Sequence, residues 1–194
     1  MPYTKEHKQK SRERILDSAS RLFSRRGYDA VSIDDLMRDA GMTRGAFYNH
    51  FEDKADVYAQ AILHAAMNAP FARNIDRANP SLPMLEEMLD LYLSHEHIEQ
   101  LQKVDPPCPL AFLVTDVGVR EDKVRSAYTR VHRGLADLIG RSIEGNGRDV
   151  NQLGLAVTAL MIGGVAIGRA LDSTDAAEDL MASCRSVAKQ LLRR

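Results

Sequence analysis

The chain has 194 residues, of which 44% are hydrophobic and 27% are charged. This is enough to bury a core in one large or two small domains, and twelve glycines and seven prolines exclude a fibrous or compositionally disordered protein. The two cysteines provide no disulfide framework, and no charged segment followed by an apolar run opens the chain. We therefore expect a cytoplasmic protein without a secretory signal.

The net charge of −1 hides an uneven distribution. Residues 1–26 carry eight basic and three acidic side chains, a net charge of +5, so the remainder carries −6. A basic end on an acidic body indicates that one end meets an anion. The alternative is an ordinary solvated helix face.

The first predicted helix carries an apolar stripe. Ile15, Ala19, Leu22 and Phe23 follow the spacing of one helical face. Gly27 is placed as the C-terminal stop of this helix.

Two short helices follow, separated by a glycine. Ser32 can cap the first of them, which runs to Ala40, and Gly41 breaks it. Thr43 can cap the next, which runs to about Asn49. Two short helices joined in this way form a helix-turn-helix unit.

The rest of the chain also predicts helices, with no strand or hairpin signal. Asp53 caps a fourth helix that ends before Pro70, and His95–Pro107 has the composition of a loop. The fold class is therefore all-α, with about nine helices. The later predicted helices are Met84–Tyr92, Leu110–Val117, Asp122–Ile143, Val150–Leu171 and Ala176–Leu192.

The segment Val31–Lys54 resembles the DNA-binding domain of the TetR/AcrR family of transcriptional regulators. Gly41, the block Phe47-Tyr48-x-His50-Phe51 and Lys54 all lie at the family's spacing, and the resemblance extends back over the first helix. It covers about a quarter of the chain. It implies an N-terminal three-helix helix-turn-helix domain (residues 1–54) and a C-terminal helical ligand-binding and dimerisation domain (residues 55–194).

The recognition helix after Thr43 would enter the major groove of DNA with its N-terminal residues nearest the base edges. Arg44 is the one long donor there and suits bidentate contact with guanine. Gly45 is small and allows the backbone to approach the DNA. Phe47 is expected to pack inward, and Asp34 and Asp35 to face away from the DNA.

Contacts to phosphate are expected around the same unit. By resemblance, Tyr48 and His50 contact phosphate, while Ser32 and Lys54 lie at helix starts where backbone N–H groups assist. The alternatives are a cap-only role for Ser32 and Thr43, a core role for Tyr48 and a plain surface role for His50. The predicted DNA-binding residues are Ser32, Thr43, Arg44, Gly45, Tyr48, His50 and Lys54.

The helix Val150–Leu171 is apolar nearly all round and contains Gly163, Gly164 and Gly168. Its uncharged run is shorter than the roughly 20 residues of a membrane span, so we expect no membrane partner. Close helix approach at a dimer seam would compensate for three glycines, and a crowded monomer core is the alternative. The helix Ala176–Leu192 would pack beside it through Leu180, Val187 and Leu191.

The resemblance implies a repressor that binds a palindromic double-stranded DNA operator as a homodimer and is released by a small-molecule effector. Candidate ligand-binding residues are aromatic, soft or polar groups on otherwise apolar helices, and ordinary core packing is the alternative for each. They are Phe71, Met88, Tyr92, Phe112, Tyr128 and His132. Asp116 could anchor a cation or simply face solvent near a helix end.

Cys108 suggests a second mode of response. A thiol at a helix N-terminus can have a lowered pKa and react with oxidants or electrophiles, so Cys108 could be a redox sensor. The alternative is a small buried hydrophobe. His95 and His97 form a pair that fits an exposed loop better than a metal site, and we expect neither metal nor cofactor.

Two other classes of protein compete with a regulator. A small helical enzyme could use Tyr128, His132 and Asp116, but no Gly-rich phosphate loop, HExxH motif or nucleophile elbow supports it. A structural DNA-binding protein without an effector is the other class. The long apolar helices after Pro80 exceed what such a protein needs for dimerisation.

Overall fold

The computed structural model describes residues 5–69, 75–99, 108–143 and 148–193. Within those ranges the regular structure is entirely helical. The helices are α1 (Lys5–Arg26), α2 (Ile33–Asp39), α3 (Arg44–Phe47), α4 (Lys54–Asn68), α6 (Leu82–Tyr92), α7 (His95–Glu99), α8 (Pro109–Phe112), α9 (Val114–Val117), α10 (Asp122–Arg141), α11 (Arg148–Gly168) and α12 (Thr174–Leu192).

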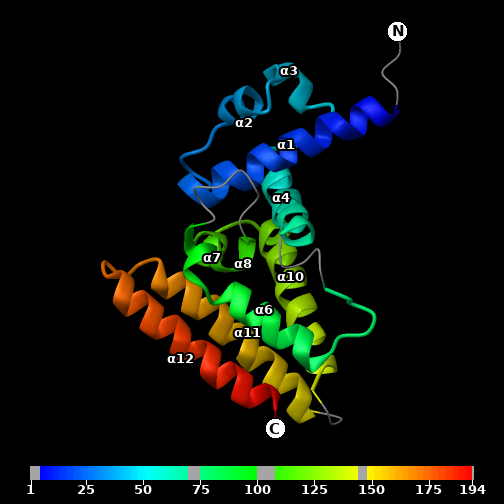
Figure 1. The fold of residues 1–194 in the computed structure, drawn as a ribbon. Helices are drawn as coiled ribbons and strands as arrows, with labels where there is room; N and C mark the ends of the chain where they lie inside the picture. The colour runs from blue at the N-terminus through cyan, green and yellow to red at the C-terminus, as the bar shows by residue number, and fades with distance from the viewer. Residues whose placement is uncertain (1–4, 70–74, 100–107, 144–147, 194) are drawn as a thin grey trace.

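The helices form a small head and a larger body (Figure 1). Helices α2 and α3 lie at the outer end, α1 crosses beneath them, and α4 runs from α1 toward the body. In the body, α10 packs on α4 and on α11, and α11 and α12 lie side by side. The N-terminal end therefore presents a helix-turn-helix at one extremity of the molecule.

The head forms because local signals and an apolar stripe agree. Ile15, Ala19 and Phe23 on α1 are at most 1% exposed and face the head's core. Ser32 caps α2 with a full capping box to Asp35, which confirms that prediction. Between α2 and α3, Gly41 takes a φ of 65°, a left-handed conformation that glycine adopts without strain.

Helix α4 belongs to both halves of the molecule. Its N-cap Asp53 accepts a hydrogen bond from the Asp56 backbone N–H at 2.7 Å, as the sequence predicts. The apolar residues of α4 between Ala55 and Ile62 lie in the head's core, and that core extends to Val124 and Ala127 of α10. The division of the chain at residue 54 stays a prediction, because α4 continues the head into the body.

In the body, α10 and α11 approach very closely. A Cβ placed on Gly154 would lie 2.4 Å from the Ala136 carbonyl oxygen, so only glycine fits there. The three glycines Gly163, Gly164 and Gly168 were predicted to lie at a dimer interface, and for two of them this prediction is wrong. Gly164 meets Leu93 and Cys184, and Gly168 meets Ile98 and Met181, all within the same chain.

Only Gly163 of that group lies open on the outer face of α11, where a Cβ would meet nothing within 4 Å. The same face leaves Leu155 and Ile167 about half exposed, at 48% and 53%. The stretch Asp149–Gly168 is long and apolar enough to cross a membrane by length and composition alone, a test that core helices of globular proteins also pass.

Several predicted boundaries shift. The segment predicted as a loop from His95 is helical over His95–Glu99, and the helix predicted over Leu110–Val117 divides into α8 and α9 at Leu113. The recognition helix ends at Phe47 rather than Asn49. These short pieces raise the number of helices in the described ranges to eleven, against the nine expected.

Candidate nucleic-acid interface

Arg44 opens α3 at the outer end of the head and is well exposed, with 60% of its side chain accessible. Its Nη1 donates to Oδ2 of Asp34 at 2.7 Å. A hydrogen bond to Tyr48 and the charge of Asp34 raise the pKa of Arg44. The expectation that Asp34 faces away is therefore wrong, because this carboxylate holds the guanidinium in the free protein.

The surface beside Arg44 carries no bulky side chain at Gly45 and is open to solvent. Gly45 is exposed, and a Cβ there would meet nothing within 4 Å, so a duplex could approach the backbone. Tyr48 is 57% exposed, which disfavours a core role. Phe47 is fully buried against Phe51, with ring centroids 5.6 Å apart, as predicted.

Thr43 and Ser32 differ in their capping. Thr43 takes the N-cap position of α3, but its side chain makes no cap hydrogen bond, so that part of the prediction is wrong. Ser32 is held by Asp35, whose carboxylate accepts from the Ser32 N–H at 3.0 Å and from its hydroxyl at 2.6 Å. A phosphate at Ser32 would have to replace this carboxylate.

Two predicted phosphate contacts have basic or aromatic neighbours. Burial, together with the nearby charges of Lys8 and Arg12 on α1, lowers the pKa of His50, which keeps the ring neutral at neutral pH. Lys54 lies over the ring of Tyr28, with Nζ 4.2 Å from the centroid. Lys8 and Arg12 were not among the predicted contacts, although they belong to the basic N-terminal run.

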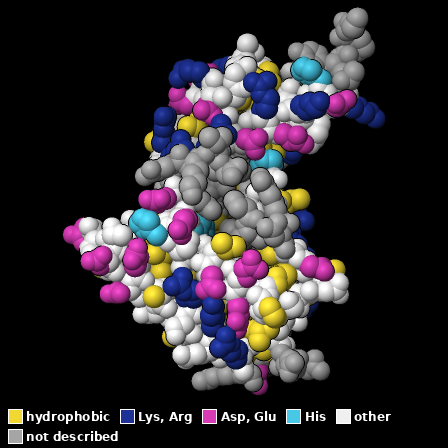
Figure 2. Space-filling model, viewed as in Figure 1, with side chains coloured by type: hydrophobic (Ala, Val, Ile, Leu, Met, Phe, Trp, Pro, Cys, Tyr) yellow, Lys and Arg dark blue, Asp and Glu magenta, His cyan; other side chains and the backbone are white. Residues whose placement is uncertain are grey.

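The charge on this end is mixed. Figure 2 shows Lys and Arg side chains around the head, with acidic side chains between them. Arg38 pairs with Asp35 at 3.2 Å, and Arg21 pairs with Asp39 at 2.7 Å. Several of the head's cations are thus held in ion pairs before any polyanion arrives.

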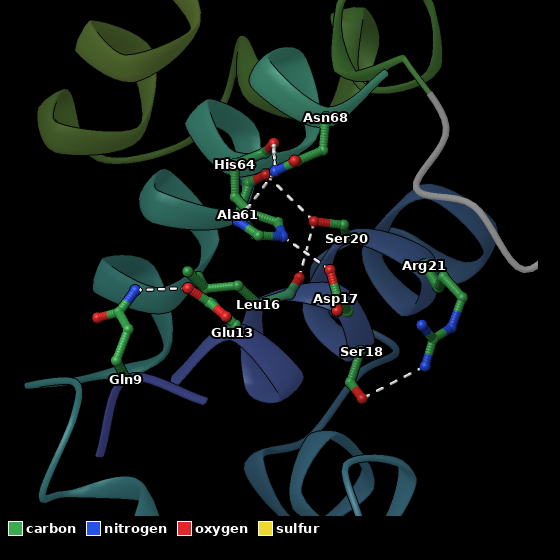
Figure 3. A network of polar contacts seen from close by, with 10 residues as sticks. All are labelled: Gln9, Glu13, Leu16, Asp17, Ser18, Ser20, Arg21, Ala61, His64 and Asn68. Atoms are coloured by element: carbon green, nitrogen blue, oxygen red, sulfur yellow. Dashed lines mark hydrogen bonds and ion pairs between the residues drawn. The ribbon is translucent and has the colours of Figure 1, made fainter. Parts of the chain in front are cut away.

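Polar contacts fix α1 on α4 (Figure 3). The Nε2 atom of His64 lies 2.7 Å from Oδ1 of Asp17. The hydroxyl of Ser20 reaches the backbone carbonyls of Leu16 at 2.8 Å and Ala61 at 3.2 Å. A displacement of α4 would therefore carry α1, and with it the head.

A second set of contacts joins the head to the body at Asp116. Its carboxylate accepts from the Tyr58 hydroxyl at 2.6 Å, the Tyr28 N–H at 3.3 Å and the Arg120 guanidinium at 2.7 Å. Arg120 also donates to both carboxylate oxygens of Asp29, at 3.0 and 2.8 Å. Asp116 thus binds the chain's own Arg120 rather than facing solvent.

The body contains a cavity of about 500 Å³ between α4, α10 and the start of α8. None of the five described candidate ligand residues lies in its lining, and Phe71 falls outside the described residues. Met88, Tyr92 and Phe112 belong to the body's core. Tyr128 donates to the Leu110 carbonyl at 2.7 Å, and His132 lies half-buried on α10.

Cys108 lines the cavity but is 1% exposed. Its Sγ donates to the Tyr92 hydroxyl at 3.4 Å, and burial raises the pKa of the thiol. This environment is opposite to that of a reactive thiolate and favours the role of a small buried hydrophobe. Among the described residues, no group of three or more His, Cys, Asp or Glu is placed to hold a metal ion.

Comparison with known proteins gives the same assignment for the head. Residues 15–61 match the family described as "Bacterial regulatory proteins, tetR family". The regulator AcrR of Shigella flexneri is 46% identical over 57 residues, which are 29% of this chain and 26% of AcrR. The negative transcriptional regulator IcaR of Staphylococcus aureus is 29% identical over 80 residues, 40% of this chain and 43% of IcaR.

The fold of the whole chain is similar to solved structures. A TetR transcriptional regulator from Chloroflexus aurantiacus superposes with a TM-score of 0.72 at 22% identity, over 95% of this chain and 97% of that one. Residues 15–61 thus carry a DNA-binding domain of the tetR family of bacterial regulatory proteins, and the whole chain has the fold of the solved regulators. The relatives are named as transcriptional regulators, so the helical-enzyme alternative is set aside.

Proposed function

We propose that the protein is a repressor that binds a palindromic operator through two copies of its helix-turn-helix and leaves it when a small molecule fills the body cavity. The observation that carries this proposal is the placement of Arg44. It is the exposed long donor at the start of a helix whose neighbours, Gly45 and Thr43, leave room for a duplex.

The same geometry supports a set of proposed contact residues. Arg44 reads a base edge after exchanging Asp34 for guanine, and Thr43 and Tyr48 reach the flanking backbone. His50 donates to phosphate as a neutral ring, and Lys54 contributes its helix N-terminus and its charge. Ser32 mainly stabilises the start of α2, because Asp35 occupies its donors.

Two copies would meet through α11 and α12. The outer face of α11 carries exposed Leu155, Ile167 and the open Gly163. On α12, Val187 is 45% exposed rather than packed against α11, which corrects that prediction and adds Val187 to the same apolar surface. Such an apolar face is typical of a homodimer interface. A two-fold dimer places two recognition helices about one turn of DNA apart, which explains why a palindrome is expected.

The effector would act through α4. This helix lines the cavity with Leu63 and Met67 and is tied to α1 by His64 and Ser20. A ligand that fits one position of α4 better than another shifts the spacing of the two heads. Regulation would take place in the cytoplasm, where the DNA is, and repression is supported by the naming of IcaR as a negative regulator.

Selection from random double-stranded DNA tests the proposal. The full chain should enrich a palindrome, and its affinity should fall steeply as salt rises, because phosphate contacts release counterions. Binding without any enriched sequence would instead support a structural DNA-binding protein and would contradict a repressor.

A further inference from the structure

The body cavity has an apolar floor. Its lining includes Leu63 and Met67 of α4, together with Leu110 of α8 and three apolar residues of α10: Val131, Leu135 and Leu138. A cavity of about 500 Å³ has the size of a small-molecule site. The floor suits a hydrocarbon or aromatic body rather than a sugar or a nucleotide.

The charged groups of the cavity all have one sign. Its described lining includes Arg77, Arg130 and Arg141 and contains no acidic side chain. Arg141 donates to the backbone carbonyl of Arg77 at 3.0 Å, which places these two residues side by side. Arg130 makes no hydrogen bond or ion pair with the described residues, so its donors are available.

We infer that the cavity binds an apolar organic anion, with its body against α4 and α10 and its carboxylate, sulfonate or phosphate on one of the two α10 arginines of the lining, Arg130 or Arg141. This inference rests on the proposed effector response and specifies the chemical class of the effector. Charge-assisted hydrogen bonds from arginine to such groups are stronger than neutral ones. A neutral compound of the same shape therefore gains only the apolar contacts.

A pair of fluorescent probes with one skeleton separates the two contributions. The anionic probe 1-anilinonaphthalene-8-sulfonate and the neutral N-phenyl-1-naphthylamine differ only in the sulfonate, and both brighten in apolar sites. We expect the full chain to bind the anionic probe about tenfold or more tightly than the neutral one, at one site per chain. Equal affinities for the two probes would overturn the inference.

Variants of α10 locate the anion. Arg130→Gln combined with Arg141→Gln should weaken the anionic probe about tenfold and leave the neutral probe within about twofold. Arg133→Gln is the matched control, because Arg133 lines only the neighbouring outer groove, whereas Arg130 borders both the groove and the cavity and Arg141 borders the cavity alone. An effect of Arg133→Gln as large as that of the double variant would place the anion in the groove and contradict the inference.

Gly134 provides a test of the cavity itself. It lies where the cavity and the outer groove meet, and a Cβ there would meet nothing within 4 Å, so Gly134→Leu adds a side chain that starts in open space. This substitution also favours the helical conformation, so the protein should still fold. Loss of both probes is expected, and unchanged binding of the anionic probe would show that it binds elsewhere.

The inference and the proposed function fail separately. Probe binding is measured without DNA, so it can succeed even if no operator is selected. Conversely, an operator that stays bound while the anionic probe saturates the cavity would leave the anion site intact and remove the effector role.

Discussion

Arg44 is held by Asp34 in the free protein, and this pair has a simple consequence for recognition. Both side chains are largely exposed, and exposed ion pairs contribute only about 0–1 kcal/mol. In the proposed complex, exchanging Asp34 for a guanine edge would therefore cost little.

Arg44→Ala should relax base preference, because a bidentate arginine–guanine contact discriminates by about 1–3 kcal/mol. The change should appear at one base pair in each half of the operator, in affinities for operators substituted one position at a time. Lys54→Ala is the comparison, and it should weaken all sequences alike. An equal loss for every sequence with Arg44→Ala would show that Arg44 contacts phosphate instead.

His97 makes stability depend on pH. Its side chain is 1% exposed, and its Nδ1 lies 2.5 Å from the Tyr92 carbonyl oxygen. Burial lowers the pKa of His97 to about 4, despite that hydrogen bond. The unfolded chain, with a histidine pKa of about 6.5, therefore binds the proton more tightly, and stability is present above this pH and lost as pH falls toward 4.

Between pH 7 and pH 5 the His97 contribution should fall by about 2 kcal/mol. Urea unfolding of the wild type and of His97→Asn at both pH values measures it. The asparagine amide can still donate to the Tyr92 carbonyl but does not titrate, so its pH dependence should be flatter by this amount. If the free energy of unfolding fell by the same amount between pH 7 and pH 5 in both proteins, a group other than His97 would control the loss of stability in acid.

At the scale of elements, α4 and the Asp116 junction connect head and body. Burial alone would raise the pKa of Asp116, but hydrogen bonds from Arg120, Tyr58 and the Tyr28 N–H lower it below its usual value. Three donors on one half-buried carboxylate make this contact costly to break. The junction therefore ties the start of α10 to the base of the head.

Asp116→Asn should destabilise the protein by about 1–3 kcal/mol, because the amide cannot satisfy Arg120 and both tyrosine donors together. Thermal and urea unfolding at pH 7 measure this. Asp122→Asn is the matched control, since Asp122 is almost fully exposed and should cost close to nothing. Similar effects of the two variants would mean that the junction is not a stabilising contact.

Helix starts could be predicted from the sequence because their signals are local. The side chains of Ser32 and Asp53 each accept a hydrogen bond from a backbone N–H three residues further along the chain. The apolar stripe of α1 can likewise be predicted from the spacing of its residues. Thr43 occupies the expected position without making the bond, so a sequence signal predicts where a cap falls better than it predicts a hydrogen bond.

The cavity could not be predicted in the same way. Its lining depends on how α4 and α10 cross, and residues such as Arg130 and Arg141 look like ordinary solvated charges in the sequence. Aromatic residues such as Tyr92 and Phe112 were predicted to bind the ligand, but they pack in the core of the body. Gly164 and Gly168 likewise serve contacts that only the tertiary structure reveals.

For the whole molecule, the proposed homodimer rests on the outer face of α11. Ile167→Arg places a charge on a half-exposed position, so a monomer should tolerate it, whereas a dimer built on this face should dissociate. Sedimentation should report a dimer for the wild type and a monomer for the variant, with unchanged helicity. Val119→Arg, on an apolar residue 78% exposed near α9, is the control and should leave the dimer intact.

The central claim is that two heads read one palindrome. It is tested most directly by titrating the full chain against the selected operator and against the same duplex with one half scrambled. We predict two chains on the palindrome and an affinity for the half-site that is lower by about 100-fold or more, because the linked second head binds intramolecularly. One chain per duplex, with equal affinity for both DNAs, would contradict the account.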